Sequence, residues 1–383
     1  MTKFSSDEYL KGDRLTAEYQ GNIYICGNVI TFSNLEFDEE VKININSLVL
    51  CKDKTYSTLD RDITIFYGKN DDDTTYKVDF ETLDYEFSGC VFNENVHFNP
   101  HENIDVTFDY CTFKEHFYIN HDEQHITKVN AIEIRDTTFE RDFAVYNAEI
   151  NSIKIKNVDF ESLSEFNEVT FQEKFDLQEI TYKGFALFDR CIFNTKAEFE
   201  YIIFEKFASF RGTTFNKGLS LDFTSADKEI NFFEIKGLGN NESKKNTSQE
   251  TYRIIKYQLQ KVGNIIGANK YHSLELSKRR RQLPFYSFDY LVLFFHWITS
   301  NHSQNWILPL FWIFIVGFMT CWGLADFGYG YCSYKVSDIF KYISIVNFDD
   351  CIKKDPIIFV LNKVLLGYLY YQFLTAIRKD TRK

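Results

Sequence analysis

FDRCIFNTKAEFEYIIFEKFASFRGTTFNKGLS, from Phe188 to Ser220, decides the fold of this 383-residue chain. Large apolar residues return in it at alternating steps of five and six, at Phe188, Phe193, Phe199, Phe204, Phe210 and Phe215. The alternation extends back to Ile155 and on to Phe232, and a small or apolar residue, such as Cys191, stands two positions before each anchor. A helix would need apolar residues every three or four positions and a strand every second position. Steps of five and six indicate instead a chain that turns a corner after each short extended segment.

Such short self-similar units are typical of a solenoid, in which each unit stacks on its neighbours and buries a shared internal column. Four faces at this spacing take about 22 residues per coil, and each coil rises by the inter-strand distance of ~4.8 Å. The six phenylalanines are therefore predicted to be structural core, in preference to a cofactor-binding site. No cofactor is expected.

The repeat resembles the pentapeptide-repeat family, in a variant whose units read roughly F-x-x-A-x-F-x-x-x-A-x, and FRGTTFNKGLS and FDRCIFNTKAE carry the resemblance. It implies a right-handed quadrilateral β-helix. Shorter pieces of the pattern begin at Phe87, and the segments NPHENIDVT and NHDEQHITKVNAIE between them are predicted to bulge as longer corners. The expected parts are N-terminal strands at 1–86 as a cap or degenerate coils, the β-helix at 87–236, a linker at 237–250, amphipathic and interfacial helices at 251–300, a first transmembrane helix at 306–325, an extracytoplasmic loop at 326–356 and a second transmembrane helix at 357–377.

Charge divides the chain into two bodies of opposite sign. Through Lys236 there are 45 acidic against 24 basic residues, a net charge of −21, whereas the remainder carries 10 against 19, or +9. The acidic body disfavours nucleic acid as a partner, and DNA mimicry, known in some soluble relatives of the resembled family, is disfavoured by a membrane anchor. The basic body beside an apolar tail favours anionic lipid.

Metal and redox chemistry have little support. The eight cysteines form no CxxC pair, and those at inward positions are interpreted as small buried hydrophobes. Histidines at 97, 101, 116, 121 and 125 lie in or near the two irregular segments without a recognised ligand spacing, so solvated loops are favoured over a metal site. No phosphate loop, nucleophile elbow or HExxH motif is present, and no enzyme activity is predicted.

The C-terminal third predicts a membrane anchor. TYRIIKYQLQKVGNIIGANKYHSLE reads as an amphipathic helix or hairpin broken near Gly263, and the cluster Lys278, Arg279, Arg280 and Arg281 is predicted to contact anionic lipid. FYSFDYLVLFFHWITS suits a helix at the interface, and two apolar segments follow. This tail resembles bacterial membrane-anchored pentapeptide-repeat proteins, and basic residues beside both segments predict an inner-membrane, multi-pass protein with both termini in the cytoplasm.

Two polar residues, Asn362 and Lys363, interrupt the second apolar segment. A lysine within a membrane is costly and hints at function, although Lys363 is also near enough to the segment end to snorkel. The favoured function is a membrane-anchored scaffold whose acidic β-helix binds an unknown protein partner or acts as a sensor. The alternative is an oligomeric pore or channel-like effector, possibly in bacterial defence, formed by homo-oligomerisation. FGYG at 327–330 is like a potassium filter but follows the first apolar segment with no pore helix before it.

Overall fold

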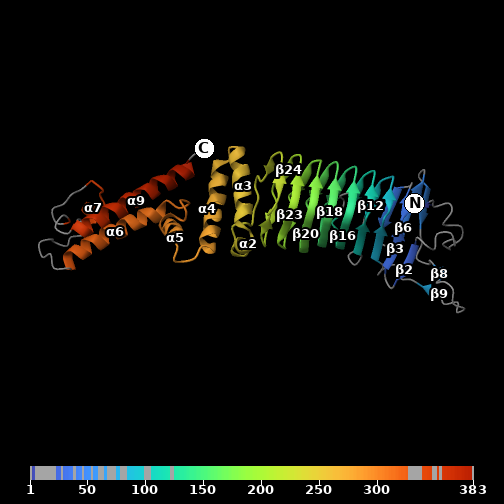
Figure 1. Cartoon of the computed structure of the whole chain (residues 1–383), viewed down its shortest axis with the longest axis horizontal. Helices are drawn as coiled ribbons and strands as arrows, with labels where there is room; N and C mark the ends of the chain where they lie inside the picture. The colour runs from blue at the N-terminus through green and yellow to red at the C-terminus, as the bar shows by residue number, and fades with distance from the viewer. Residues whose placement is uncertain are drawn as a thin grey trace. The chain divides into compact units, whose positions relative to one another are not determined.

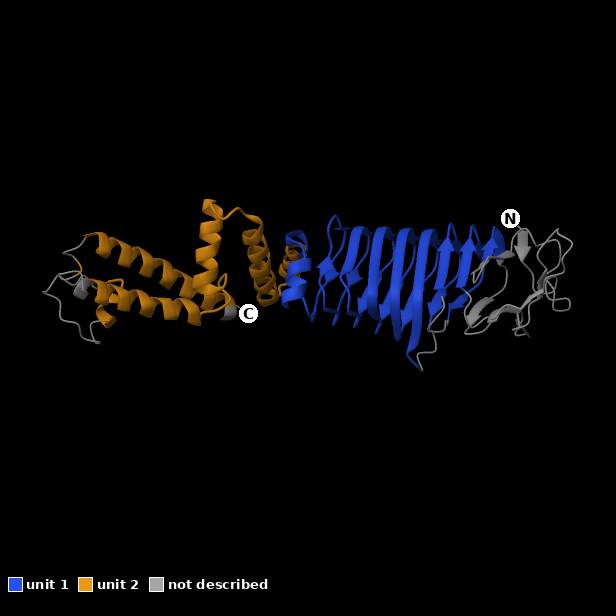
Figure 2. Ribbon diagram, turned by 90° about the horizontal axis from the view of Figure 1, so that it is seen from below, with its two compact units in different colours: residues 1–251 blue, residues 252–383 orange. Residues whose placement is uncertain are grey.

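The computed structural model divides into two compact units, residues 1–251 and 252–383 (Figure 2). It describes residues 2–4, 23–26, 29–37, 40–44, 47–52, 55–58, 64–66, 75–77, 84–98, 105–120, 125–326, 339–346, 352 and 356–381. Unit 1 is a β-solenoid of about six turns, and unit 2 consists of helices (Figure 1).

The strands of unit 1 are β1 Thr2–Phe4, β2 Ile23–Cys26, β3 Val29–Ser33, β4 Leu35–Phe37, β5 Glu40–Asn44, β6 Ser47–Lys52, β7 Thr55–Thr58, β8 Thr64–Phe66, β9 Thr75–Lys77, β10 Asp84–Ser88, β11 Val91–Phe92, β12 Val96–Phe98, β13 Asp105–Asp109, β14 Thr112–Phe113, β15 Phe117–Ile119, β16 Thr127–Phe139, β17 Phe143–Tyr146, β18 Ala148–Phe160, β19 Ser164–Asn167, β20 Thr170–Tyr182, β21 Ala186–Asp189, β22 Ile192–Phe193, β23 Ala197–Phe204, β24 Ala208–Ser209, β25 Thr214–Phe215, β26 Leu219–Ser220, β27 Ser225–Ala226 and β28 Ile230–Asn231. The helices are α2 Asn241–Asn246, α3 Gln249–Lys261, α4 Ile265–Gln282, α5 Phe288–Ser300, α6 Ile307–Asp326, α7 Ile339–Tyr342 and α9 Pro356–Thr381.

Strand register confirms the predicted coil length. From Ser152 onward every pairing with the following coil is parallel and joins residues 22 positions apart, as Phe160 with Tyr182 and Tyr182 with Phe204. The six phenylalanines at 188, 193, 199, 204, 210 and 215 have no exposed surface. The alternation of five and six therefore places one large inward side chain on each of four faces per coil.

Stacked rings form continuous columns inside the solenoid. One column of six rings is Phe92, Phe113, Phe139, Phe160, Tyr182 and Phe204. Its neighbouring ring centroids lie 4.6 to 5.2 Å apart, close to the strand spacing, so aromatic stacking and backbone pairing reinforce each other. A second column joins Phe166, Phe188, Phe210 and Phe232.

Two rows of corners turn through left-handed backbone, and glycine occupies only one of the twelve corner positions named below. One row is Tyr110, Asp136, Asn157, Glu179, Tyr201 and Phe223, and the other is Asn120, Asn147, Glu168, Arg190, Gly212 and Glu234. Their φ angles lie between +43° and +70°, a conformation that costs most residues about 1–2 kcal/mol. Several corner amides donate to the next coil, as when the Arg190 amide donates to the Arg211 carbonyl oxygen at 2.8 Å. The chain therefore makes tight corners although it contains only 17 glycines.

The N-terminal strands act both as a coil and as a cap. Strands β3, β4 and β5 pair in parallel with β10, β11 and β12, and the Phe32 ring stacks on Phe87 at 4.9 Å. Strand β2 then pairs with β3 in antiparallel fashion, and β6 does so with β5. This switch ends the parallel stack at β3 and β5, whereas β1 still pairs in parallel with β4. An open edge would otherwise template pairing with another chain.

The two coils that contain the predicted insertions differ in length. Phe113 pairs with Phe139, 26 positions later, so the coil that contains NHDEQHITKVNAIE has additional residues. Phe92 pairs with Phe113 after 21 positions, so the coil that contains NPHENIDVT has none. Residues 99–104, where the first longer corner is predicted, lie outside the described residues.

The segment predicted to be a linker, 237–250, contains helix α2 and the start of α3. Ser243 is fully buried, and its hydroxyl donates to the Phe215 carbonyl oxygen at 3.0 Å. The hydroxyls of Thr247 and Thr251 accept from the amides of Leu219 and Leu221 at 3.2 and 2.9 Å. These polar side chains satisfy backbone groups of the last coil, so a sequence without apolar periodicity closes the end of the solenoid.

Unit 2 begins with the predicted broken hairpin. Helices α3 and α4 are separated at Gly263, which has φ +77°, and Asn264 caps α4 by accepting from the Gly267 amide. Among the described residues one helix is long and apolar enough to cross a membrane, α9 over Pro356–Lys379. The apolar stretch of α6, Ile307–Gly323, spans about 26 Å at 1.5 Å per residue, short of a ~30 Å hydrocarbon core, so the first predicted span stays a prediction.

Candidate functional site

Side chains of α9 bind three consecutive backbone carbonyl groups of the segment 339–346. Asn362 Nδ2 donates to the Tyr342 oxygen at 3.2 Å, Tyr370 Oη to the Ile343 oxygen at 3.2 Å and Lys363 Nζ to the Ser344 oxygen at 2.8 Å. The polar residues that interrupt this apolar helix are therefore hydrogen-bond partners of the C-terminal end of α7 and the two residues after it. We call this set the carbonyl cluster.

The segment 339–346 lies beside the middle of α6. A Cβ atom on Gly317, the eleventh residue of this 20-residue helix, would come within 2.3 Å of Ile343 Cγ2. The segment belongs to the region expected to be an extracytoplasmic loop, yet this part of it folds back against the helix. Backbone carbonyl groups that are removed from water need hydrogen-bond donors, and the side chains of the carbonyl cluster supply them.

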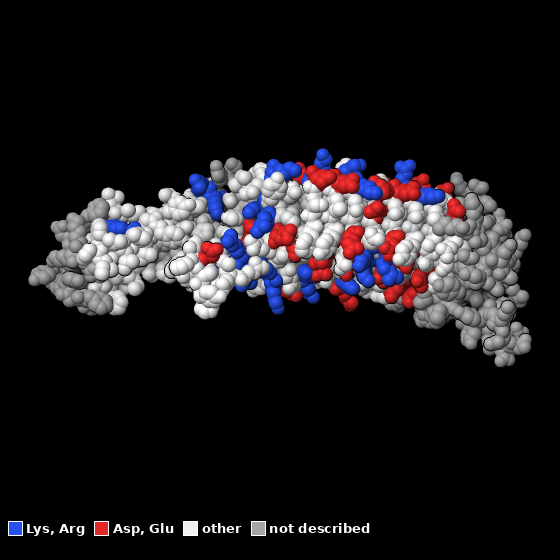
Figure 3. Space-filling view, in the orientation of Figure 1, with Lys and Arg blue, Asp and Glu red and all other residues white. Residues whose placement is uncertain are grey.

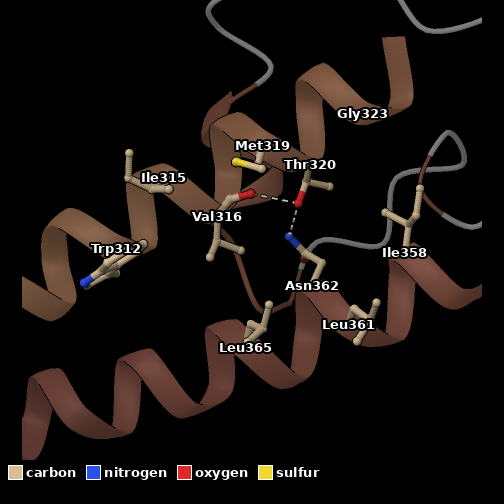
Figure 4. A pocket seen from close by; sticks show the side chains of 10 residues that line it. All are labelled: Trp312, Ile315, Val316, Met319, Thr320, Gly323, Ile358, Leu361, Asn362 and Leu365. Carbon is tan, nitrogen blue, oxygen red and sulfur yellow. Dashed lines mark hydrogen bonds between the residues drawn. The ribbon is translucent and has the colours of Figure 1, made fainter. Parts of the chain in front are cut away.

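A groove of about 340 Å³ runs between α6 and α9 next to the carbonyl cluster (Figure 4). Its lining is apolar apart from two residues, Thr320 and Asn362. Asn362 Nδ2 donates to Thr320 Oγ1 at 2.9 Å, and Thr320 Oγ1 donates to the Val316 carbonyl oxygen at 2.8 Å. Asn362 Oδ1 is buried and has no partner among the described residues. The groove fits an apolar chain, and its polar pair joins the two helices. The lining residues are Trp312, Ile315, Val316, Met319, Thr320, Gly323, Ile358, Leu361, Asn362 and Leu365.

A second polar group joins the α5–α6 turn to α9. Ser300 Oγ and Ser303 Oγ lie 3.0 and 3.3 Å from Gln372 Oε1, and His302 Nδ1 lies 3.3 Å from His296 Nδ1. Asn301, His302 and Ser303 all have φ between +48° and +63°. Burial, followed by the neighbouring His296, lowers the pKa of His302 to about 3. His302 is therefore neutral in this fold at ordinary pH.

The four predicted lipid-contact residues have different surroundings. The Arg280 guanidinium lies 4.1 Å from the centroid of the Trp297 ring, and Arg279 Nη2 lies 3.5 Å from Asp289 Oδ2. Arg281 is exposed and Lys278 is half-buried. Arg280 thus packs α4 against α5, whereas the others extend from the last turn of α4.

Two basic side chains of α3 are neutralised within the hairpin. Glu275 is buried, and its carboxylate receives Lys256 Nζ at 2.8 Å and Arg253 Nε at 3.2 Å. Burial raises the pKa of Glu275, but these cations outweigh it and hold the pKa below its usual value. Sequence periodicity alone could not show that a carboxylate on α4 faces this side of α3.

The outer surface of the solenoid carries mixed charge and one aromatic pair. Acidic and basic side chains alternate over the face that Figure 3 shows. Many are paired between coils, as Arg190 Nε with Glu168 Oε1 at 3.1 Å. Tyr201 and Phe223 stack at 4.8 Å on a corner row although they are 54% and 65% exposed, and exposed Ile203 lies two residues beyond Tyr201. Sequence reasoning missed this pair, whose signal is an aromatic residue at each of two corner positions 22 apart.

The histidines do not form a described metal site. His116 Nδ1 lies 3.3 Å from Asp142 Oδ2, and His97 packs on the Tyr118 ring at 5.4 Å. His101, His121 and the FGYG motif at 327–330 lie outside the described residues. Within the described part of the chain, no group of three or more His, Cys, Asp or Glu side chains could hold a metal.

Comparison with known proteins gives no family assignment. No family model matches the chain, and no curated protein or solved structure matches it. The repeat and the structure therefore carry the functional argument.

Proposed function

We propose that this chain is a membrane-anchored scaffold of the pentapeptide-repeat type, which presents its solenoid to a protein partner on the cytoplasmic side of a bacterial inner membrane. The observation that carries the proposal is α9. Its apolar stretch covers 24 residues, and only 22% of its most apolar window is buried within the chain. An apolar helix with so much uncovered surface requires an apolar environment, and a bilayer supplies it.

The partner surface is proposed to include the corner pair Tyr201 and Phe223 with Ile203. Exposed aromatic side chains are enriched at the centres of protein interfaces, and these two are held rigid by the coils beneath them. The surrounding charge is mainly acidic by sequence, which favours a partner with a basic rim. Nucleic acid is not a proposed partner.

The alternative of an oligomeric pore has weaker support. It would need Asn362 and Lys363 to face water, whereas both donate to backbone carbonyls of the same chain. One experiment separates the two proposals. The full chain is expressed in a bacterium while membrane potential is followed, and a photo-crosslinking residue is placed at position 201, with position 157 of the same corner row as the control.

The scaffold proposal expects carbonate-resistant membrane association, an unchanged potential and a crosslinked protein specific to position 201. Rapid depolarisation by the wild-type chain would favour the pore. Release of the chain by carbonate would overturn both proposals, because each depends on a membrane-spanning anchor.

A further inference from the structure

The turn between α4 and α5 carries the most exposed aromatic residues of the described chain. Phe285 and Tyr286 are each 77% exposed, and Phe288 is 87% exposed. Val292 and Phe295 continue the same face of α5 one and two turns later, and both are exposed. An exposed apolar patch of this kind on a folded protein marks a surface that binds another protein or a membrane.

Basic side chains flank this patch directly. The last turn of α4 holds Arg279 and Arg281, both exposed, at six and four residues before Phe285. Apolar rings beside exposed arginines match the boundary between acyl chains and anionic headgroups, where rings enter the interface and guanidinium groups meet phosphate.

The geometry of the turn is fixed by its own contacts. The Ser287 hydroxyl accepts from the Tyr290 amide at 3.1 Å and starts α5, and Arg280 stacks on Trp297. These contacts leave Arg279 and Arg281 on the exposed side of the turn. Arg279 Nη2 also lies 3.5 Å from the exposed Asp289 carboxylate, so a headgroup phosphate has to compete with Asp289 for Arg279. Helix α5 is joined to α9 through Ser300 and Gln372, so the patch is connected to the proposed anchor within unit 2.

We infer that the α4–α5 turn is a second membrane-binding site, in which Phe285, Tyr286 and Phe288 enter the interface and Arg279 and Arg281 bind the anionic headgroups of phospholipids. The inference rests on the proposed membrane anchoring and adds the lipid class to it. It also assigns Arg280 a positioning role, because its guanidinium faces the Trp297 ring.

Hydrogen exchange of the full chain in lipid nanodiscs tests the site. One set of discs contains phosphatidylcholine alone, and the other contains phosphatidylglycerol as well. Two arginines at about 1 kcal/mol each near an anionic surface correspond to roughly a 30-fold change in the ratio of bound to free turn. Amides 285–292 are therefore expected to exchange up to about 30-fold more slowly in the anionic discs.

Three variants divide the contributions. The double variant Arg279→Gln/Arg281→Gln should lose the difference between the two lipids, and Arg279→Lys/Arg281→Lys should keep most of it. Phe285→Ser/Phe288→Ser should raise exchange in both lipids, whereas Tyr110→Ser, which removes an exposed ring of the solenoid outside the proposed partner surface, should leave the turn unchanged. Unaltered exchange of solenoid amides reports correct folding of each variant.

The results also separate this inference from the proposed function. Protected α9 amides with equal exchange of the turn in both lipids would overturn the headgroup site while keeping the anchor. Equal exchange of the wild type and the arginine-to-glutamine variant in anionic discs would do the same. Unprotected α9 amides would overturn the anchor and this inference with it.

Discussion

Tyr182→Phe is expected to stabilise the solenoid. Tyr182 stands in the six-ring column between Phe160 and Phe204, at centroid distances of 5.0 and 5.2 Å, and has no exposed surface. Within the described part of the chain its hydroxyl makes no hydrogen bond of good geometry, and neither does the fully buried hydroxyl of Ser164, which lies near it. Burial raises the pKa of Tyr182 far above its usual value, and the nearby Ser164 hydroxyl offsets this only in part.

The magnitude follows from the unpaired hydroxyl. Burying such a group without a partner costs about 1–3 kcal/mol, while the ring itself keeps its stacking in the variant. We therefore expect a gain of about 1–2 kcal/mol in the free energy of unfolding. For a unit of this size each kcal/mol raises the melting temperature by roughly 2–4 °C.

The assay is thermal unfolding of the full chain in detergent, followed by the β-sheet signal in far-ultraviolet circular dichroism. Phe204→Tyr is the matched control, since it adds a hydroxyl to the same column and should lower the melting temperature. A lower melting temperature for Tyr182→Phe would refute the reasoning, because it would show that the hydroxyl donates to Ser164. A double variant with Ser164→Ala would then measure that coupling.

Three further predictions concern the core, the carbonyl cluster and the buried imidazoles. Phe199→Asp places a carboxylate where no surface is exposed and should unfold the coil stack; an unchanged sheet signal and melting curve would contradict the four-sided register. Lys363→Met leaves the Ser344 carbonyl without its donor, at a cost of about 1–3 kcal/mol, so amides 340–346 should exchange about tenfold faster or more, with Lys341→Met as control. Because the pKa of His302 is about 3 in the fold and near 6.5 when unfolded, its contribution is complete above about pH 6.5 and is lost as the pH falls toward 3, by at most about 1.4 kcal/mol per pH unit. Exchange of amides 296–304 at a series of pH values measures this loss, and His302→Asn should flatten the profile; equal profiles would contradict the assignment. The titratable and charged groups acting on His302 are His296, Arg280, His272 and Lys379.

The repeat was predictable because its signal is local and redundant. Each coil needs large apolar residues at the same inward positions. Phe188, Phe199 and Phe210 therefore each predict the same strand register independently. The closing helix α2 was not predictable in this way. Its role depends on Ser243 and Thr247 meeting backbone groups of the last coil, and such contacts leave no apolar period in the sequence.

Asn362 and Lys363 were recognisable as unusual, but their role was not. Both water-facing and snorkelling lysines interrupt an apolar segment in the same way. Which role applies depends on the carbonyl groups of residues 342–344, about 20 residues earlier in the chain. The segment that carries them packs against Gly317 of α6, and this places the carbonyl groups beside α9. Likewise, the pairing of Arg253 with Glu275 depends on how α3 and α4 face each other.

The 22-residue separation of paired residues in the later coils makes the length of the solenoid adjustable by duplication. Removing or copying one such interval would join the same corner types and the same columns, and would change the rod by one strand spacing of ~4.8 Å. The 26-residue interval between Phe113 and Phe139 shows that a corner also accepts extra residues while the rings stay stacked at 4.6 Å. Duplication or deletion within genes for such chains can therefore change the length of the solenoid by whole coils. Insertions at single corners can change its surface, and both kinds of change preserve its cross-section.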